Sequence, residues 1–462
     1  MKIKEPLIDK VKRIYIVLFI TYLMLSRMVL FVNVITMNVN SIIYNLLAAG
    51  GCVILLWDFI LNLYEFKSTE NIILLSFLLV CGASTIINRT YGYMDNLKTL
   101  VWTAIQFYIL FSSLYIKTQE KLQHSMKTIM SITTGIWFIS TVISLVQFLL
   151  QIGYRMDFSE FSRRQGFVDS RLFGIYSDPN FAAVTSLIMI IFSLFLFLNG
   201  NNMLVRFFHG LNIVLQLLYV VLSGSRTGRY EAVILAFILP LLLIRNTLIK
   251  RRDRNYKIKS LAMAALITAI VLVFTKYSAG PLIKLAQIRQ NLMGGAAGEH
   301  ISGGDIDLTR EDVSEDDISN NRFKIWKSSV EVAQSSRIIG VSPRNLVPYA
   351  KANYPESYIA KTGYETHNGY LAVYVGTGII GSIVISLFVL YMLYKILRYS
   401  IYRKGRVWNE SAIVCFCTAL VIGISALMLL DIFFVNTFSG AIFWLFTGYL
   451  LYIARRGRNT YE

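Results

Sequence analysis

The stretch from Ser411 to Ile453 reads SAIVCFCTALVIGISALMLLDIFFVNTFSGAIFWLFTGYLLYI, and it decides the fold. Its one charged residue is Asp431. As a single helix this stretch would be about 65 Å long, roughly twice the hydrocarbon thickness of a bilayer. The chain must therefore fold back within it. We predict two membrane-spanning helices that turn at Asp431.

The rest of the chain has the same apolar character. Its 462 residues are 55% hydrophobic and only 16% charged, and a soluble protein of this size needs more polar surface. Because a bilayer-spanning helix needs about 20 apolar residues, the sequence predicts an all-α polytopic membrane protein with about twelve transmembrane helices. The predicted spans are 14–32, 41–63, 71–87, 99–116, 128–152, 180–198, 203–222, 231–249, 260–275, 369–394, 411–430 and 432–453.

Lysine and arginine predict the orientation of these spans. They gather at the N-terminus, in the segments 117–127, 245–259 and 395–406, and at 455–458. Because such residues favour the cytoplasmic side, we predict that both termini are cytoplasmic. Anchoring of the spans also accounts for the net charge of +18. The basic residues form no folded stripe, so we expect no nucleic acid among the partners.

The predicted topology divides the chain into four segments. These are N-terminal transmembrane helices at 1–160, central transmembrane helices with an arginine-bearing turn at 161–275, a large extracytoplasmic loop at 276–368, and C-terminal transmembrane helices at 369–462.

The large loop contains two patterns typical of amphipathic helices. Apolar residues recur at helical spacing from Leu282 to Leu292 and again from Phe323 to Ala333, with Ser319 or Asn320 as a plausible N-cap for the second helix. Between them, the acidic segment 305–317 lacks the ligand pattern of an EF-hand. We expect it to be solvated and mobile, which we favour over a cation site.

Several arginines stand on the predicted outer side, where the orientation rule does not account for them. They are therefore better candidates for chemistry than the cytoplasmic ones. His367 is the one histidine of four at an outward membrane boundary, and an imidazole there can accept a proton from a hydroxyl. The alternative is a helix-capping or interfacial histidine. The outward arginines before the sixth span and between the seventh and eighth are Arg155, Arg163, Arg164, Arg171, Arg226 and Arg229.

Four motifs follow one another on this outer side. They are Arg171-Leu172-Phe173-Gly174 with Asp178-Pro179-Asn180-Phe181-Ala182, then Ser223-Gly224-Ser225-Arg226-Thr227-Gly228, then Asn321-Arg322 with Trp326 and Ile339-Gly340-Val341, and finally His367-Asn368-Gly369-Tyr370-Leu371 with Gly378-Ile379-Ile380-Gly381. In this order, over residues 165–395, the chain resembles the O-antigen ligase and polysaccharide polymerase superfamily of bacterial membrane glycosyltransferases. One departure is Ser342-Pro343, where the family usually has another glycine.

The resemblance implies a substrate and a place of action. The donor would be a glycan attached through a diphosphate to a polyprenyl lipid, such as undecaprenyl diphosphate, and the acceptor would be another glycan. The protein would lie in the lipid bilayer of the bacterial cytoplasmic membrane, with its active site on the extracytoplasmic face, and would serve polysaccharide biosynthesis for the cell envelope. The resemblance leaves room for a chain-length regulator as a further partner.

The resemblance also implies roles for three residues. Arg226 and Arg322 would hold the diphosphate and stabilise its departure, because guanidinium groups bind phosphate oxygens bidentately and stay ionised. His367 would deprotonate the acceptor hydroxyl, and direct displacement would invert the anomeric carbon. No metal or other cofactor is expected, since arginines replace the cation.

Further substrate-binding candidates each have a plainer alternative. Arg171 is as well explained by snorkelling at the interface, and Arg229 by accompanying Arg226 at its turn. Asn180 is better explained as a cap of the sixth span, and Asn368 either orients His367 or caps its helix.

Three functions remain open at this stage. Polymerisation of repeat units in capsular, exopolysaccharide or O-antigen biosynthesis is favoured, but the motifs do not separate it from an O-antigen ligase with a lipid-A core or wall acceptor. A lipid-linked oligosaccharide flippase is expected to show two related halves and charges deep in its spans. This chain shows neither, and Arg27 and Asp58 come nearest to exceptions.

Overall fold

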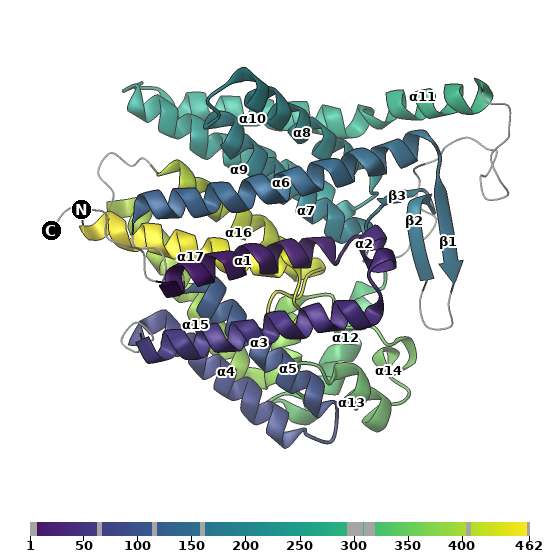
Figure 1. Cartoon of the computed structure of the whole chain (residues 1–462), viewed down its shortest axis with the longest axis vertical. Helices are drawn as coiled ribbons and strands as arrows, with labels where there is room; N and C mark the ends of the chain where they lie inside the picture. The colour runs from purple at the N-terminus through teal and green to yellow at the C-terminus, as the bar shows by residue number, and fades with distance from the viewer. Residues whose placement is uncertain are drawn as a thin grey trace.

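The computed structural model describes residues 7–61, 67–112, 118–157, 162–292, 308, 319–402 and 408–459. Long helices run side by side through it in one bundle (Figure 1). Within the described residues, ten helical segments are long and apolar enough to cross a membrane, which confirms the all-α polytopic fold. The acidic segment 305–317 lies outside the described residues apart from Leu308.

Twelve helical stretches correspond to the twelve predicted spans. α1 has several charged residues near its start, and the helix formed by α5 continues in the π-helical segment η2; these two stretches are the ones not among the ten. The stretches are α1 (Leu7–Leu25), α3 (Met37–Leu61), α4 (Thr69–Ile87), α5 (Tyr93–Ile105) with η2 (Gln106–Phe111), α6 (Gln119–Leu149), α7 (Pro179–Leu198), α8 (Met203–Leu222), α9 (Arg226–Lys250), α10 (Tyr256–Tyr277), α15 (Gly369–Tyr402), α16 (Glu410–Met428) and α17 (Phe438–Asn459).

The predicted hairpin at Asp431 is confirmed. α16 ends at Met428, α17 begins at Phe438, and Asp431 lies in the turn between them. Its Oδ1 accepts hydrogen bonds from the backbone N–H groups of Phe433 and Phe434, both at 2.9 Å. The carboxylate thus satisfies backbone donors that the turn leaves without helical partners.

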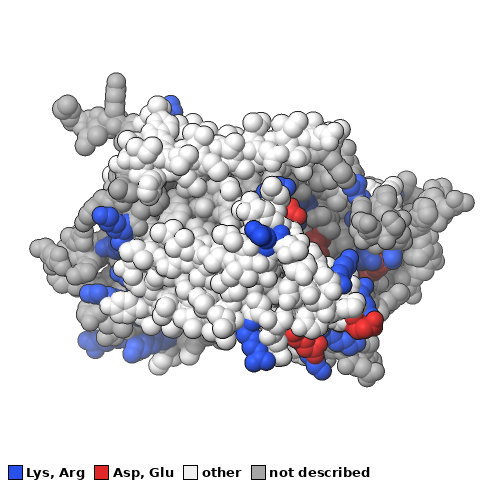
Figure 2. Space-filling view, turned by 90° about the horizontal axis from the view of Figure 1, so that it is seen from below, with Lys and Arg blue, Asp and Glu red and all other residues white. Residues whose placement is uncertain are grey.

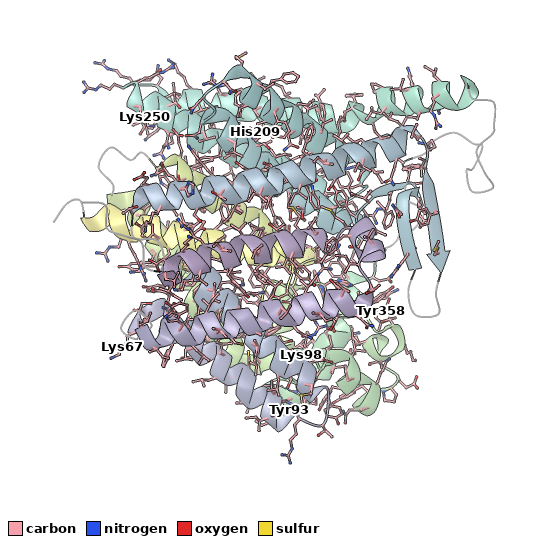
Figure 3. The ribbon with its side chains drawn as sticks, viewed as in Figure 1. Lys67, Tyr93, Lys98, His209, Lys250 and Tyr358 are labelled. Atoms are coloured by element: carbon pink, nitrogen blue, oxygen red, sulfur yellow. The ribbon has the colours of Figure 1, made fainter. Side chains whose placement is uncertain are left out.

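The start of α1 and the end of α17 lie at one end of the bundle (Figure 1). Lys67 and Lys250 are at the same end (Figure 3). In Figure 2 Lys and Arg side chains lie at both ends and at the centre of this face, whereas acidic side chains are seen over the centre and the opposite end.

The opposite end contains the shorter elements. They are α2 (Val29–Val34), β1 (Gly153–Asp157), β2 (Ser162–Val168), β3 (Arg171–Gly174), α11 (Ala279–Leu292), α12 (Arg322–Ala333), α13 (Leu346–Asn353) and α14 (Tyr358–Thr362) (Figure 1). The strands form an antiparallel sheet in the order β1-β2-β3, which the sequence analysis did not predict. α11 and α12 confirm the two helices predicted in the large loop.

The predicted N-cap of α12 is wrong, by two residues for Ser319 and by one for Asn320. The cap is Asn321, in the left-handed region at φ 62°, and not Ser319 or Asn320. Asparagine tolerates this conformation better than most residues, which allows the helix to begin one residue later. The Ser319 hydroxyl still accepts a bond from Phe323 N at 3.4 Å.

Charged side chains inside the bundle are paired or hydrogen-bonded. Lys12 Nζ on α1 lies 2.5 Å from Asp58 Oδ2 on α3, and the two side chains are 2% and 1% exposed. Glu231 on α9 accepts a hydrogen bond from Ser425 Oγ on α16 at 2.6 Å. The second contact joins α9 to α16 close to the end that contains Asp431.

Candidate functional site

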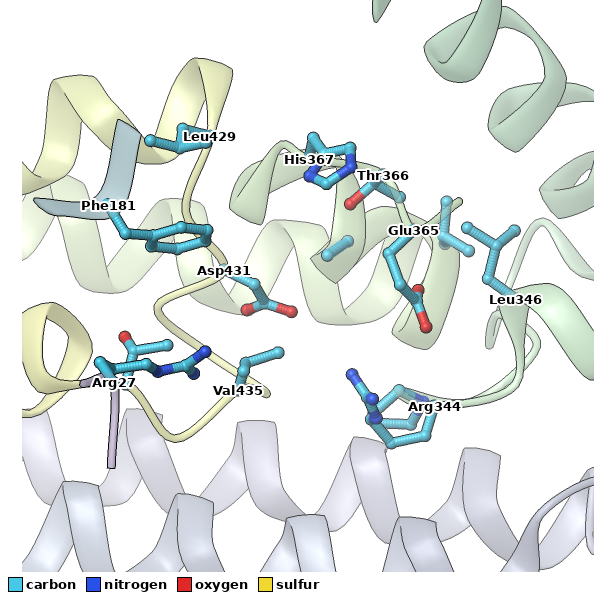
Figure 4. Close-up of a pocket in the computed structure, with 14 residues that line it drawn as sticks. Arg27, Phe181, Arg344, Leu346, Glu365, Thr366, His367, Leu429, Asp431 and Val435 are labelled. Carbon is cyan, nitrogen blue, oxygen red and sulfur yellow. The ribbon is translucent and has the colours of Figure 1, made fainter. Parts of the chain in front are cut away.

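A pocket of about 170 Å³ opens beside the start of α15 and the turn between α16 and α17, and Figure 4 shows the side chains that line it. Segments that are far apart in sequence line it. Arg27 comes from the turn after α1, Arg344 from the loop before α13, Glu365 and His367 from the approach to α15, and Asp431 from the turn between α16 and α17.

The backbone at His367 is held in an unusual conformation. His367 has φ 47°, in the left-handed region that residues other than glycine seldom adopt. The carbonyl of Thr366 accepts a bond from Trp326 Nε1 of α12 at 3.0 Å. On the other side, Asn368 Oδ1 accepts from Leu371 N at 3.0 Å. Asn368 therefore caps the start of α15, and such over-determined strain is typical of functional sites.

Two charged residues act on His367 from other elements. His367 is exposed at the pocket mouth, but the surrounding protein still withdraws water from it and lowers the pKa of the imidazole. The Arg322 charge lowers this pKa further, and Asp178 partly opposes the shift. His367 is therefore neutral at neutral pH and able to accept a proton. The fold thus places Arg322 where its charge acts on His367.

Arg226 stands at the same end of the bundle, as the first residue of α9. Ser225 caps this helix by accepting a bond from Gly228 N at 3.2 Å. A Cβ on Gly228 would lie 2.8 Å from Ala183 Cβ, so glycine allows α9 to start against α7. Arg226 is half-buried, makes no hydrogen bond or ion pair within the described chain, and does not line the pocket.

Arg171 is buried and joins three elements. From β3, its Nε donates to the carbonyl of Ser223 at 2.9 Å, and its Nη2 donates to Asn180 Oδ1 at 2.8 Å. Arg229 Nη2 similarly donates to the carbonyl of Val221 at 2.8 Å. These contacts hold the turn that precedes Arg226 against the start of α7.

The cap of α7 is Asp178, not Asn180. Asp178 Oδ1 accepts bonds from Asn180 N at 2.6 Å and from Phe181 N at 3.2 Å, and Pro179 occupies the first helical position. The side chain of Asn180 instead accepts the hydrogen bond from Arg171. The cap places the Asp178 carboxylate where its charge reaches His367.

The segment that carries Arg344 lies against a break in α15. At Gly378 the φ is 64°, and backbone groups on both sides of this break pair with residues 337–342. Val341 N donates to Val375 O at 2.9 Å, and Ser342 N donates to Gly376 O at 3.1 Å. A Cβ on Gly378 would lie 2.4 Å from the carbonyl carbon of Ile338. Only glycine permits this approach.

Ser342 shows how the chain departs from the family's usual glycine. It has φ 86°, a conformation that favours glycine, yet it is buried and keeps its side chain. Its hydroxyl donates to the carbonyl of Ser84 on α4 at 2.8 Å. Two residues later, Arg344 N donates to Asn96 Oδ1 of α5 at 2.9 Å. α4 and α5 therefore fix the segment that presents Arg344.

The pocket includes residues that the sequence analysis did not propose for the site. The sequence predicts Arg27 as a charge within the first span and Asp431 as a turn, with no part in the site for either. Arg344 and Glu365 stand beside motifs that were quoted, which is the signal that could have pointed to them. Within the described residues, no group of three or more His, Cys, Asp or Glu side chains is placed to hold a metal ion.

Burial in the pocket disfavours negative charge. It raises the pKa of Glu365, where Arg344 opposes the shift and Asp431 adds to it. It also raises the pKa of Asp431, where the N–H groups of Phe434 and Phe433 oppose the shift. Burial thus disfavours the ionised form of both carboxyl groups, and the nearby Arg344 charge favours it.

The fold and the pocket define a multi-pass membrane protein with a polar site at one end of its helical bundle. Residues 211–386 match the family model described as O-Antigen ligase. Over this segment the chain is similar to the O-antigen ligase family of membrane enzymes. The matched segment contains the Ser223–Arg229 turn, Arg322 and His367, whereas the Arg171 motif precedes it. No curated protein matches the chain.

Proposed function

We propose that this protein is an inverting, metal-independent glycosyltransferase that moves a glycan from a polyprenyl-diphosphate carrier to a sugar hydroxyl. The reaction is polymerisation of repeat units of a cell-envelope polysaccharide. The observation that supports it best is the electrostatic coupling of Arg322 to His367 beside a polar pocket. A cation for the leaving group and a neutral base for the acceptor are the two groups that such a transfer requires.

The proposed step is a single displacement. The acceptor oxygen bonds to the anomeric carbon, and its proton passes to the His367 imidazole. The bond from that carbon to the diphosphate oxygen breaks, and its electron pair stays on the diphosphate. Arg322 and Arg226 stabilise the charge that develops there. His367 later releases the proton to water, which restores the neutral base.

Donor binding would also strengthen the base. The positive charge of Arg322 lowers the pKa of His367 in the free protein. A diphosphate bound to Arg322 offsets that charge, so the imidazole holds a proton more firmly once the donor is present. The imidazole is thus a stronger base when the donor is bound.

Four other residues keep their proposed substrate-binding roles. Arg171, Arg229, Asn180 and Asn368 all lie next to the segments that present Arg226 or His367. Their hydrogen bonds to the protein support positioning of those segments, and substrate contacts would add to this role. The proposed location is the bacterial cytoplasmic membrane, with the pocket on the extracytoplasmic face and both termini in the cytoplasm.

The test is a reconstituted reaction. Purified protein in nanodiscs, given only lipid-linked repeat units, should build a ladder of products. A ligase would build none until a foreign acceptor glycan was added. The variant His367→Ala should give no product while reaching the membrane normally. If it still supported glycan assembly in cells, the flippase alternative would be favoured instead.

A further inference from the structure

The transfer step proposed above leaves four charged pocket residues without a role. Arg27, Arg344, Glu365 and Asp431 are half-buried and line the pocket together with His367 (Figure 4). Arg322 and Arg226 are not among the lining residues. The pocket and the cations assigned to the diphosphate are therefore different parts of the site.

These side chains retain unused hydrogen-bonding capacity. Within the described chain, the guanidinium groups of Arg27 and Arg344 and the carboxyl group of Glu365 make no hydrogen bond or ion pair, although Arg27 lies 5.8 Å from the centre of the Phe181 ring. Asp431 uses Oδ1 for its turn and leaves Oδ2 without such a bond. Polar groups that line a pocket without protein partners point to a polar ligand.

The charges indicate which ligand. Two carboxyl groups face two guanidinium groups, so the pocket lacks the excess of positive charge that a diphosphate needs. An anion would be repelled by Glu365 and Asp431. Sugar hydroxyls both donate and accept hydrogen bonds, whereas carboxylates only accept and guanidinium groups only donate. A neutral sugar therefore matches all four groups.

The size and the position of the pocket agree with this ligand. Its volume of about 170 Å³ leaves room for a sugar ring, and the pocket is open on one side, so the rest of a glycan can extend from it. The imidazole of His367 stands at the same pocket, so a hydroxyl of the bound ring can reach the base. Asn96 and the Asp431 turn hold two of the binding groups in advance.

We propose that this pocket is the acceptor subsite, which binds the terminal sugar of the acceptor glycan through Arg27, Arg344, Glu365 and Asp431 and presents one hydroxyl to His367. The proposal rests on the proposed function. It separates the two substrates by charge, with the diphosphate beside Arg322 and the neutral sugar in the pocket of mixed charge.

Binding to purified protein in nanodiscs tests this separation with two probes. One is an oligosaccharide hydrolysed from the host's own polysaccharide, free of lipid and phosphate; the other is undecaprenyl diphosphate. Glu365→Gln and Asp431→Asn should each weaken oligosaccharide binding about tenfold or more, since hydrogen bonds to charged groups contribute about 1.5–3 kcal/mol. Binding of undecaprenyl diphosphate should stay within about twofold, because these groups do not contact it.

Matched controls have the same chemistry outside the pocket. Glu356→Gln removes a carboxylate that pairs with Lys361 at 2.7 Å, and Asp169→Asn removes one that pairs with Arg164 at 3.1 Å. Both controls should bind the two probes like the wild type. Asparagine at 431 retains the oxygen that accepts the turn's N–H groups. If either pocket variant misfolds, Arg27→Gln provides the same test from a different segment.

The outcomes separate the two proposals. The acceptor subsite is refuted if the pocket variants weaken undecaprenyl diphosphate binding and leave the oligosaccharide unaffected. It is also refuted if wild-type protein binds undecaprenyl diphosphate but no oligosaccharide, a result that leaves the glycosyltransferase proposal intact. Binding of neither probe would refute both. Selective loss of the oligosaccharide in the pocket variants supports the subsite.

Discussion

Arg171 provides the sharpest test of how the site is held together. Its side chain is only 6% exposed, and it links β3 to Ser223 at the end of α8 and to Asn180 at the start of α7. Hydrogen bonds from a charged donor contribute about 1.5–3 kcal/mol each, so Arg171→Met should lower the free energy of unfolding by about 3–6 kcal/mol. Arg171→Lys keeps the charge, but an ammonium group lacks the fork that reaches both acceptors. Arg171→Lys should therefore lower the free energy of unfolding by about half as much as Arg171→Met.

Thermal unfolding in nanodiscs, followed by tryptophan fluorescence, measures these differences. The expected order of stability is wild type, then Arg171→Lys, then Arg171→Met. Arg164→Met is the matched control, because Arg164 pairs with Asp169 at a partly exposed site and should contribute about 0–1 kcal/mol. If Arg171→Met unfolded like the wild type but had a raised KM for the lipid-linked donor, substrate binding and not positioning would be the role of Arg171.

Two further predictions concern charge. Because Arg322 lowers the pKa of His367 and Asp178 raises it, Arg322→Gln should move the acid limb of the kcat/KM profile to higher pH, and Asp178→Asn should move it to lower pH while preserving the cap of α7. Shifts in the same direction would contradict the assignment of His367 as the base. Asp58→Asn should lower the free energy of unfolding by about 3–5 kcal/mol, because it leaves the Lys12 ammonium buried without its counter-charge; a thermal unfolding assay measures this loss. The double variant with Lys12→Met and Asp58→Leu should be much closer to the wild type in stability, because no buried charge is left unpaired. Equal losses of stability in the double variant and in Asp58→Asn would disprove this account.

Local physics explains why much of the fold was predictable. The free energy of moving apolar side chains out of water identifies the spans, and a bilayer of fixed thickness sets their length, so the turn at Asp431 follows from the stretch Ser411–Ile453 alone. α11 and α12 follow from helical periodicity within the large loop. The three-stranded sheet could not be predicted from the sequence, because strands as short as β3 (Arg171–Gly174) contain too few residues for a period-two pattern.

The sequence by itself determined the membrane architecture, the family motifs and the candidate base His367. Only the tertiary structure decided which charges share a pocket, since Arg27 is more than 300 residues from Arg344 and Asp431 in the sequence. The reason is physical. Apolar helices are soluble in the bilayer in many side-by-side arrangements. Packing between the helix surfaces selects the one arrangement that brings these helix ends together. The sequence alone places Arg171 among the outward arginines. In the packed structure this side chain is buried and links β3 to α7 and α8.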